Sequence, residues 1–237
     1  MYIRMANKEN YLKAGRKKSD IKYIVVHYTA NNGDTARNNL EYYAREVVKA
    51  SAHYYVDENE VCCSVPWYDV AYHCGGKNYK GTTPKFYAAC RNFNSIGVEM
   101  CSRRDAAGAY YFKDEVILRT AVFVAQLMEE YDVPIERVIR HYDVTGKRCP
   151  APFIDERTWA AFKELIQKQR KEKESEKMAE KEVVYKKVEE IPAGEFRETI
   201  RELIEKGVVK GSGTGLNLTY DMVRMLVFMR RMIITYK

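Results

Sequence analysis

Two histidines and one cysteine of this chain have the residue types and the spacing to bind a zinc ion. His27 ends an apolar run, and His141 and Cys149 are separated by a seven-residue loop. Imidazole nitrogens and a thiolate sulfur are ligands that zinc prefers, and three protein ligands leave a fourth tetrahedral position open, as in catalytic sites. A lone His beside a strand is usually a core residue and a lone Cys usually packing, but the three together predict zinc-dependent hydrolysis.

Segments of strand and helix character surround these residues. Residues 23–28 form a short apolar run rich in β-branched side chains, which is typical of a central strand covered on both faces. His27 lies at its carboxyl end, where ligands gather in open α/β sheets. We expect further strands at 51–56, 60–65, 95–101 and 137–141, a functional loop over 72–94, and helices over 36–47 (capped by Asp34), 114–131 and 155–168.

The chain divides into a main domain, a charged segment and a small module. We place the main domain at residues 1–168 and a charged linker or helix at 169–186, where almost nothing is apolar. Residues 187–237 carry two amphipathic stripes separated by a glycine-rich turn, which predicts a small helical module. A core of this size is marginal, so we expect the module to dock or to self-associate.

Composition narrows the partners and the location. The net charge of +7 favours anionic partners, among them acidic cell-wall polymers, although a solvated surface explains it equally well. Nucleic-acid binding is not expected, because no ordered basic and aromatic pattern accompanies the charge. No transmembrane segment is expected either, since no run of about 18 apolar residues occurs. A polar, basic amino terminus without a signal core predicts a cytoplasmic protein on synthesis, and its six cysteines are expected to be thiols.

Four motifs in order carry a family resemblance. They are Val26-His27-Tyr28-Thr29-Ala30, Ser51-Ala52-His53-Tyr54-Tyr55-Val56-Asp57, Asn94-Ser95-Ile96-Gly97-Val98-Glu99, and His141 with Lys147-Arg148-Cys149-Pro150. Residues 20–168 closely resemble the zinc-dependent N-acetylmuramoyl-L-alanine amidases, of the superfamily shared by phage lysozyme-type amidases and peptidoglycan recognition proteins. The resemblance implies an α/β fold with a central mixed sheet flanked by helices. It also implies Zn²⁺ on His27, His141 and Cys149, and cleavage of the amide between muramic acid and L-alanine in bacterial peptidoglycan.

The same resemblance implies roles for two charged residues. Glu99 is the candidate general base, and Lys147, two residues before the Cys ligand, is expected to stabilise the developing oxyanion. An exposed strand residue is the ordinary alternative for Glu99. Several relatives carry a catalytic Tyr before the His of the second motif, but this chain has Ala52 there, so proton transfer is expected to depend on Glu99. His53 is expected to be structural and not a fourth ligand.

Three residues are candidates for substrate contacts. His73 matches a His-containing loop that lines the groove in similar proteins, and an ordinary exposed loop His is nearly as good an interpretation. Tyr28 and Asn31 follow the first zinc ligand closely and are weaker candidates.

The combined prediction is a phage or prophage endolysin that waits in the cytoplasm and reaches the cell wall after membrane permeabilisation. The alternatives are a host autolysin and a recognition module that binds peptidoglycan without cutting it; the thiolate ligand Cys149 favours catalysis. The module at 187–237 faintly resembles one S-layer homology repeat, so it is expected either to bind the wall or to form a homodimer through its Met-rich helix.

Overall fold

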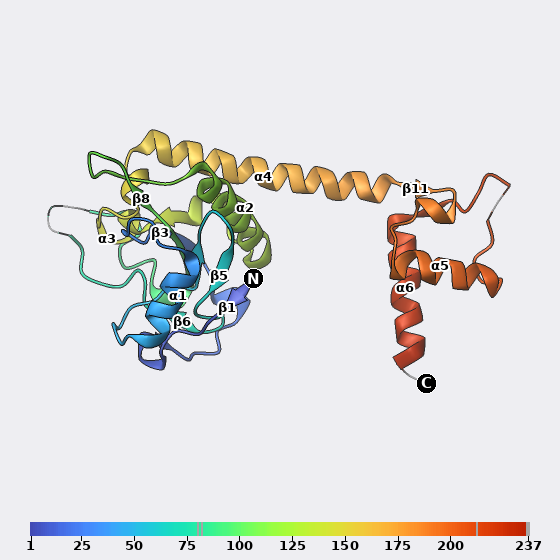
Figure 1. Cartoon of the computed structure of the whole chain (residues 1–237), viewed down its shortest axis with the longest axis horizontal. Coiled ribbons are helices and arrows are strands. Elements are labelled where there is room, and N and C mark those ends of the chain that lie inside the picture. Colours follow the sequence, from blue (N-terminus) through green and yellow to red (C-terminus); the bar gives the residue numbers. More distant parts are fainter. Residues whose placement is uncertain (80, 82, 212, 236–237) are drawn as a thin grey trace. The chain divides into compact units, whose positions relative to one another are not determined.

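The structure is a computed structural model that describes residues 1–79, 81, 83–211 and 213–235, without the side chains of 177–182 and 233–235. It divides into two units, Met1–Arg170 and Lys171–Lys237 (Figure 1). No helix within the described residues has the length and apolar character to cross a membrane.

A six-stranded mixed sheet forms the centre of the first unit. Its order is β1 (Tyr2–Ile3), β5 (Val61–Cys63), β4 (Tyr54–Val56), β7 (Ser95–Met100), β3 (Tyr23–Tyr28) and β10 (Val138–Arg140). The pair of β4 and β5 is antiparallel, and all other neighbours are parallel. The expected mixed sheet flanked by helices is therefore confirmed, and the strand predicted at 23–28 has the predicted bounds.

The two faces of the sheet pack against different elements. Ile24, Val26, Ile96, Val98 and Met100 alternate along β3 and β7 and join the main core with α2 (Asp114–Tyr131) and the start of α4 (Glu156–Glu182). Such side chains contribute roughly 1.5–3 kcal/mol each when fully buried. Because strand side chains alternate, His27 and Glu99 point to the other face, which carries smaller clusters with α1 (Ala36–Arg45) and α3 (His141–Thr145).

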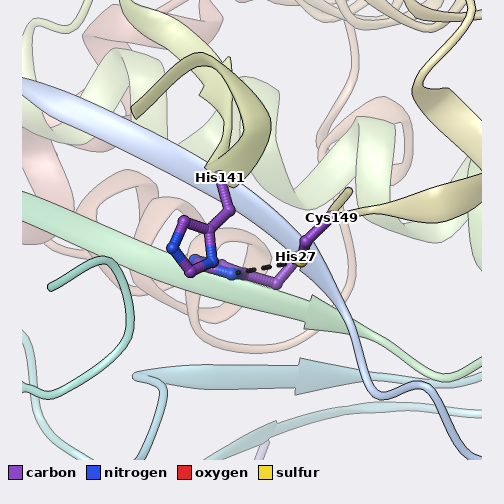
Figure 2. Close-up of side chains that lie close together, drawn as sticks. All are labelled: His27, His141 and Cys149. Atoms are coloured by element: carbon purple, nitrogen blue, oxygen red, sulfur yellow. Dashed lines mark hydrogen bonds between the residues drawn. The ribbon is translucent and has the colours of Figure 1, made fainter. Parts of the chain in front are cut away.

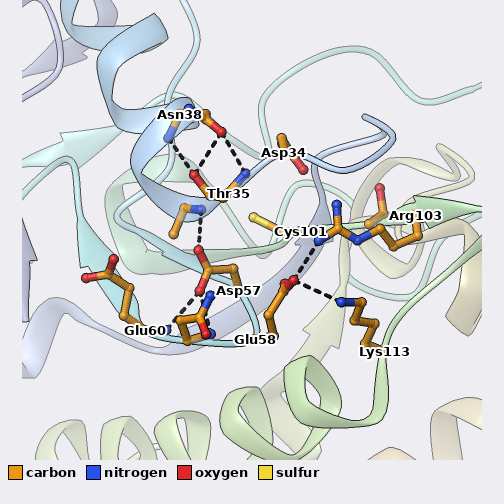
Figure 3. A network of polar contacts seen from close by, with 12 residues as sticks. Asp34, Thr35, Asn38, Asp57, Glu58, Glu60, Cys101, Arg103 and Lys113 are labelled. Atoms are coloured by element: carbon orange, nitrogen blue, oxygen red, sulfur yellow. Dashed lines mark hydrogen bonds and ion pairs between the residues drawn. The ribbon is translucent and has the colours of Figure 1, made fainter.

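A polar network fixes the amino terminus of α1 (Figure 3). The helix begins after Thr35, whose hydroxyl accepts the backbone N–H of Asn38 at 3.1 Å, so Thr35 is the cap and the expected cap Asp34 is wrong. Asp57 in the β4–β5 turn accepts the Ala36 N–H at 2.8 Å. The adjacent Glu58 pairs with Arg103 at 2.7 Å and with Lys113 at 3.0 Å. The turn thereby ties α1 to the segments that follow β7.

Short elements complete the first unit. The ladders β2 (Tyr11–Leu12) with β6 (Val70–Ala71) and β8 (Arg103–Arg104) with β9 (Tyr110–Tyr111) are antiparallel. The described residues between 72 and 91 form turns without helix or strand, as expected for this loop. The described residues of this unit also form the 3-10 helices η1 (Lys8–Asn10), η2 (Lys18–Asp20), η3 (Asn92–Asn94), η4 (Ile135–Arg137) and η5 (Ala151–Phe153), and η6 (Val188–Glu190) belongs to the second unit.

The second unit is a helical pair with a small ladder. Helix α4 continues through the charged segment to Glu182, and β11 (Val184–Tyr185) then pairs with β12 (Leu218–Thr219). Helices α5 (Glu195–Glu205) and α6 (Tyr220–Thr235) pack together over a core of Tyr185, Ile191, Ile200, Leu218 and Val223. Both predicted helices are present, but the methionines of the stripe predicted for α6 are exposed, and Val223 is buried in the core of the unit instead. The ladder was not predicted.

Candidate metal centre

Two parallel strands, β3 and β10, and the loop after α3 bring the predicted zinc ligands together. β10 pairs with β3 so that Arg140 lies opposite Val26, and His141 therefore follows directly beside His27. Cys149 comes from the loop after α3, just before the cis peptide bond to Pro150. Because the carboxyl ends of parallel strands meet at one edge, side chains far apart in the sequence converge there (Figure 2).

The geometry of the three side chains suits one metal ion. Their ligand atoms lie within 4.8 Å of one another, and all three residues are buried. His27 Nδ1 lies 3.6 Å from Cys149 Sγ, and the rings of His27 and His141 are 4.8 Å apart between centroids. His141 Nδ1 is buried without a hydrogen-bond partner among the described residues. An unpaired buried nitrogen is costly in a folded protein, and a metal at this position would satisfy it.

The electrostatics of the three residues also fit a cation. Burial lowers the pKa of His27 well below its usual range, and burial, followed by Lys147 and His73, lowers the pKa of His141 to about 3. Both imidazoles are therefore neutral, with lone pairs to donate. Burial and then Glu99 raise the pKa of the Cys149 thiol to about 12, against a backbone hydrogen bond from Tyr28. A thiol in such surroundings loses its proton readily only to a metal.

A chain of hydrogen bonds begins at Nε2 of His27, the ring nitrogen that does not face Cys149. This nitrogen lies 3.0 Å from His73 Nδ1, and His73 Nε2 lies 3.1 Å from Ser95 Oγ. The Ser95 hydroxyl donates to the Arg91 carbonyl at 2.7 Å. Beyond His73, the ring of His53 follows at 5.5 Å between centroids, so all four histidines of the chain form one contiguous row in the order 141, 27, 73, 53.

Glu99 faces the same site from β7. It lies directly opposite His27 in the parallel β3–β7 ladder, so both side chains point to one face. Part of the residue is exposed, yet its Oε2 is shielded from solvent and has no hydrogen-bond partner among the described residues. Burial raises the pKa of this carboxyl to about 8; Lys147 opposes the rise and Asp34 adds to it. The structure therefore brings Glu99 and Lys147 into the electrostatic surroundings of the predicted zinc ligands.

Arg140 anchors the segment that carries two of the ligands. Its guanidinium is buried, makes two hydrogen bonds to the Asp143 carboxylate and reaches the carbonyl of Phe153 at 2.9 Å. Asp143 also accepts the Arg140 backbone N–H at 2.8 Å, which closes the first turn of α3. The strand that precedes His141 and the chain that follows Cys149 are thus joined at one side chain.

The candidate substrate residues have different placements. His73 is buried, and both of its ring nitrogens are engaged by His27 and Ser95, so it does not line a groove as expected. The reason is Gly97, which has no side chain and lets the His73 ring lie directly on β7. Asn31 is exposed and donates to Asp34 at 3.0 Å. Tyr28 is half-buried and packs edge-on against Tyr110.

Two contributors to the site were missed from the sequence. Ser95 supports His73, and the backbone N–H of Tyr28 bonds the Cys149 sulfur. Both lie within the motifs of the family resemblance, but a hydroxyl partner and a backbone donor leave no spacing pattern in a sequence. The position of Ser95 two residues before Gly97 on the same strand face is the one signal that was available.

Comparisons with known proteins point to one family. Residues 17–152 match the family model described as N-acetylmuramoyl-L-alanine amidase. The chain is similar to the N-acetylmuramoyl-L-alanine amidase BlyA of Bacillus subtilis (strain 168), with 38% identity over 153 residues, which cover 61% of this chain and 40% of BlyA. It is also similar to the N-acetylmuramoyl-L-alanine amidase CwlL of Bacillus licheniformis, with 36% identity over 62% of this chain and 40% of CwlL. The chain thus spans about two fifths of the length of these relatives.

A solved structure is also similar to this chain. The structure of PlyL superposes with a TM-score of 0.55 at 27% identity, and the match covers 70% of this chain and 96% of PlyL.

Proposed function

Because this chain belongs to the N-acetylmuramoyl-L-alanine amidase family, we propose that it is a peptidoglycan hydrolase that cleaves the amide between N-acetylmuramic acid and L-alanine of the stem peptide. The observation that carries the proposal is the buried trio of His27, His141 and Cys149 with Glu99 opposite His27 in the sheet. Such a constellation suits hydrolysis of an unactivated amide, which needs an electrophile, a base and a proton donor.

We infer that His27, His141 and Cys149 hold a zinc ion. The donor set is two neutral nitrogens and one sulfur, and the unpaired His141 Nδ1 supports the assignment. When bound, zinc supplies Lewis-acid polarisation of the scissile carbonyl and makes a water molecule more acidic. Three protein ligands leave room for the substrate, as a catalytic site requires.

Glu99 and Lys147 supply the remaining chemistry. The Glu99 carboxylate accepts a proton from the attacking water and returns it to the leaving amine, which is the role of a general base followed by a general acid. Burial raises the pKa of this carboxyl to about 8, which makes the carboxylate a stronger base than an exposed glutamate and lets it hold the proton until the amine leaves. The Lys147 ammonium stabilises the negative charge that develops on the carbonyl oxygen. Tyr28 and Asn31, one and four residues after His27 in the sequence, are proposed to contact the substrate.

The reaction itself tests the proposal. The purified chain is expected to contain one zinc ion and to release stem peptides that begin with L-alanine from defined muropeptides, as read by mass spectrometry. A chelator should abolish the release, and added Zn²⁺ should restore it. A zinc-loaded protein that binds peptidoglycan but never liberates stem peptides would instead favour a recognition module.

We propose an endolysin role, with action on the wall after membrane permeabilisation. A mutant endolysin from Bacillus subtilis is among the similar solved structures, with 26% identity, a TM-score of 0.55 and coverage of 70% of this chain and 97% of that one. The net charge of +7 supports attraction to anionic wall polymers. A host autolysin is the alternative. Unlike an endolysin, an autolysin would reach the wall without a second protein that permeabilises the membrane.

A further inference from the structure

The hydrogen bonds behind His27 determine where its protons lie. The Ser95 hydroxyl proton is donated to Arg91, so Ser95 Oγ can only accept from His73, which places a proton on His73 Nε2. A neutral imidazole has one N–H, so His73 Nδ1 is an acceptor and takes the Nε2 proton of His27. His27 Nδ1, the atom 3.6 Å from Cys149 Sγ, is left with a free lone pair.

The surroundings hold His73 in this orientation. A Cβ at Gly97 would lie 2.6 Å from the His73 ring, so only glycine admits the ring at this place on β7. Asn92 accepts the backbone N–H groups of His73 and Cys74 at 3.1 and 2.8 Å and fixes the chain that carries the ring. Backbone and ring are therefore both constrained.

We propose that His73 is a positioning residue that fixes the tautomer of His27 for zinc, with Ser95 as its anchor. Ligating histidines usually donate their second N–H to a carboxylate, a carbonyl or water, and here an imidazole takes that place. The inference rests on zinc binding in the proposed function, and it gives the His-containing loop a role in metal affinity and not in substrate contact.

Zinc affinity of the full chain, measured by competition with a chromogenic chelator, tests this role. His73→Leu removes the acceptor and is expected to weaken zinc binding about 10- to 100-fold, as loss of a ligand's outer partner does elsewhere. His73→Asn places an amide oxygen near the former Nδ1 and is expected to restore most of the affinity. Ser95→Ala should weaken binding in the same direction, whereas Ser64→Ala, at another buried serine, should not.

The outcomes separate this inference from the proposed function. If wild type binds zinc and His73→Leu binds it within twofold, or if His73→Asn is no better than His73→Leu, the positioning role is wrong. If wild type binds no zinc, the proposed metal centre is wrong, and so is this inference, which depends on it. Circular dichroism identifies a variant that fails to fold. If His73→Leu fails to fold, the zinc affinities of Ser95→Ala and Ser64→Ala decide, and equal affinities contradict the positioning role.

An independent observation concerns the second unit. Met222, Met225, Met229 and Met232 recur at intervals of three, four and three along α6, and each exposes between 46% and 64% of its surface. This spacing places them in one stripe and is the spacing of a coiled-coil seam. Phe228, 61% exposed, extends the stripe, while Val223 on the opposite side of α6 is buried in the core of the unit.

The charges of α6 favour a protein partner over an anionic surface. Its arginines lie within ion-pair distance of acids of the same unit: Arg224 with Asp221, Arg230 with Glu202 and Arg231 with Glu195. The stripe is thus not flanked by unneutralised cations of α6, which an anionic lipid or wall polymer would need. Five half-exposed side chains offer on the order of 500 Å² per copy, and two copies reach the roughly 1,000 Å² that a specific interface requires.

We propose that α6 pairs with α6 of a second copy of this chain through Met222, Met225, Met229 and Met232. Methionine side chains are flexible and polarizable, so identical stripes can interdigitate. Each copy then buries the apolar face that a unit of this size cannot cover alone.

Analytical ultracentrifugation of the full chain tests the pairing. We expect wild type to sediment as a dimer at micromolar concentrations and the double variant Met225→Glu/Met229→Glu as a monomer. Val208→Glu is the matched control, because Val208 is 64% exposed in the same unit but lies outside α6. A wild type that stays monomeric at the highest soluble concentration overturns the pairing, as does a double variant that remains dimeric. If the double variant unfolds, Met225→Cys should crosslink between copies under oxidising conditions, and a failure to crosslink contradicts the seam.

Discussion

We expect Cys149→Ser to lose zinc and, with it, hydrolysis of peptidoglycan. Serine keeps the size of the side chain but replaces a soft thiolate by a hydroxyl that does not ionise at neutral pH, so one of three ligands is lost. Zinc affinity should fall by more than about 100-fold, since even the outer partner of a ligand contributes about 10- to 100-fold. Release of stem peptides should fall below detection at stoichiometric zinc.

Thermal or urea unfolding gives a second readout of the same substitution. At free zinc of about 100 times the dissociation constant, the wild type should gain about 2.7 kcal/mol in free energy of unfolding, and Cys149→Ser should gain almost none. Cys101→Ser is the control, because Cys101 is equally buried and accepts a weak hydrogen bond from Asn39 that a hydroxyl can retain. A Cys149→Ser protein that keeps stoichiometric zinc and full activity would remove Cys149 from the metal centre.

We expect Glu99→Gln to separate zinc binding from turnover. Glutamine matches glutamate in shape and leaves His27, His141 and Cys149 in place, so zinc affinity should change little. An amide cannot accept the proton of the attacking water, and the loss of general base catalysis should lower kcat by about 10²- to 10⁴-fold. KM should change less than kcat, because proton transfer matters in the transition state.

A second carboxylate supplies the control for this experiment. Glu58→Gln alters a carboxylate that pairs with Arg103 and Lys113 in the β4–β5 turn, and it should leave kcat within about twofold. A Glu99→Gln protein with wild-type kcat on defined muropeptides would assign the base role elsewhere. Loss of zinc from Glu99→Gln would instead indicate that the carboxylate supports the metal centre.

The sequence predicted the parts of the fold whose patterns are periodic. The apolar run at 23–28 became β3, and the alternation at 95–101 became β7, which ends at Met100, because side chains on a strand covered on both faces must be apolar or paired. The stripe of α2 was equally clear. The ladders β2–β6 and β11–β12 were not predicted, since two-residue strands are defined by their partners and have no pattern of their own.

For the candidate site, residue types were easier to predict than orientations. The convergence of His27, His141 and Cys149 followed from the two motifs that contain them and from the family resemblance of residues 20–168. The burial of His73 did not follow, because it depends on the space above Gly97, a contact across 24 positions of sequence. Asp34 was expected as a cap for a similar reason, since Asp and Thr both favour that position and only tertiary contacts, here Asp57 on the Ala36 N–H, decide between them.

The contiguous row of imidazoles makes the metal centre unusually easy to observe in solution. Since every histidine of the chain belongs to that row, each ring signal in a nitrogen-correlated NMR spectrum reports on one place in the molecule. Which nitrogen of each ring carries hydrogen can be read directly from such spectra. The histidine rings therefore serve as spectroscopic probes of the metal centre. In a sample without a histidine tag, a titration with Zn²⁺ would show signals from the two ligating rings and their two neighbours and from no other histidine.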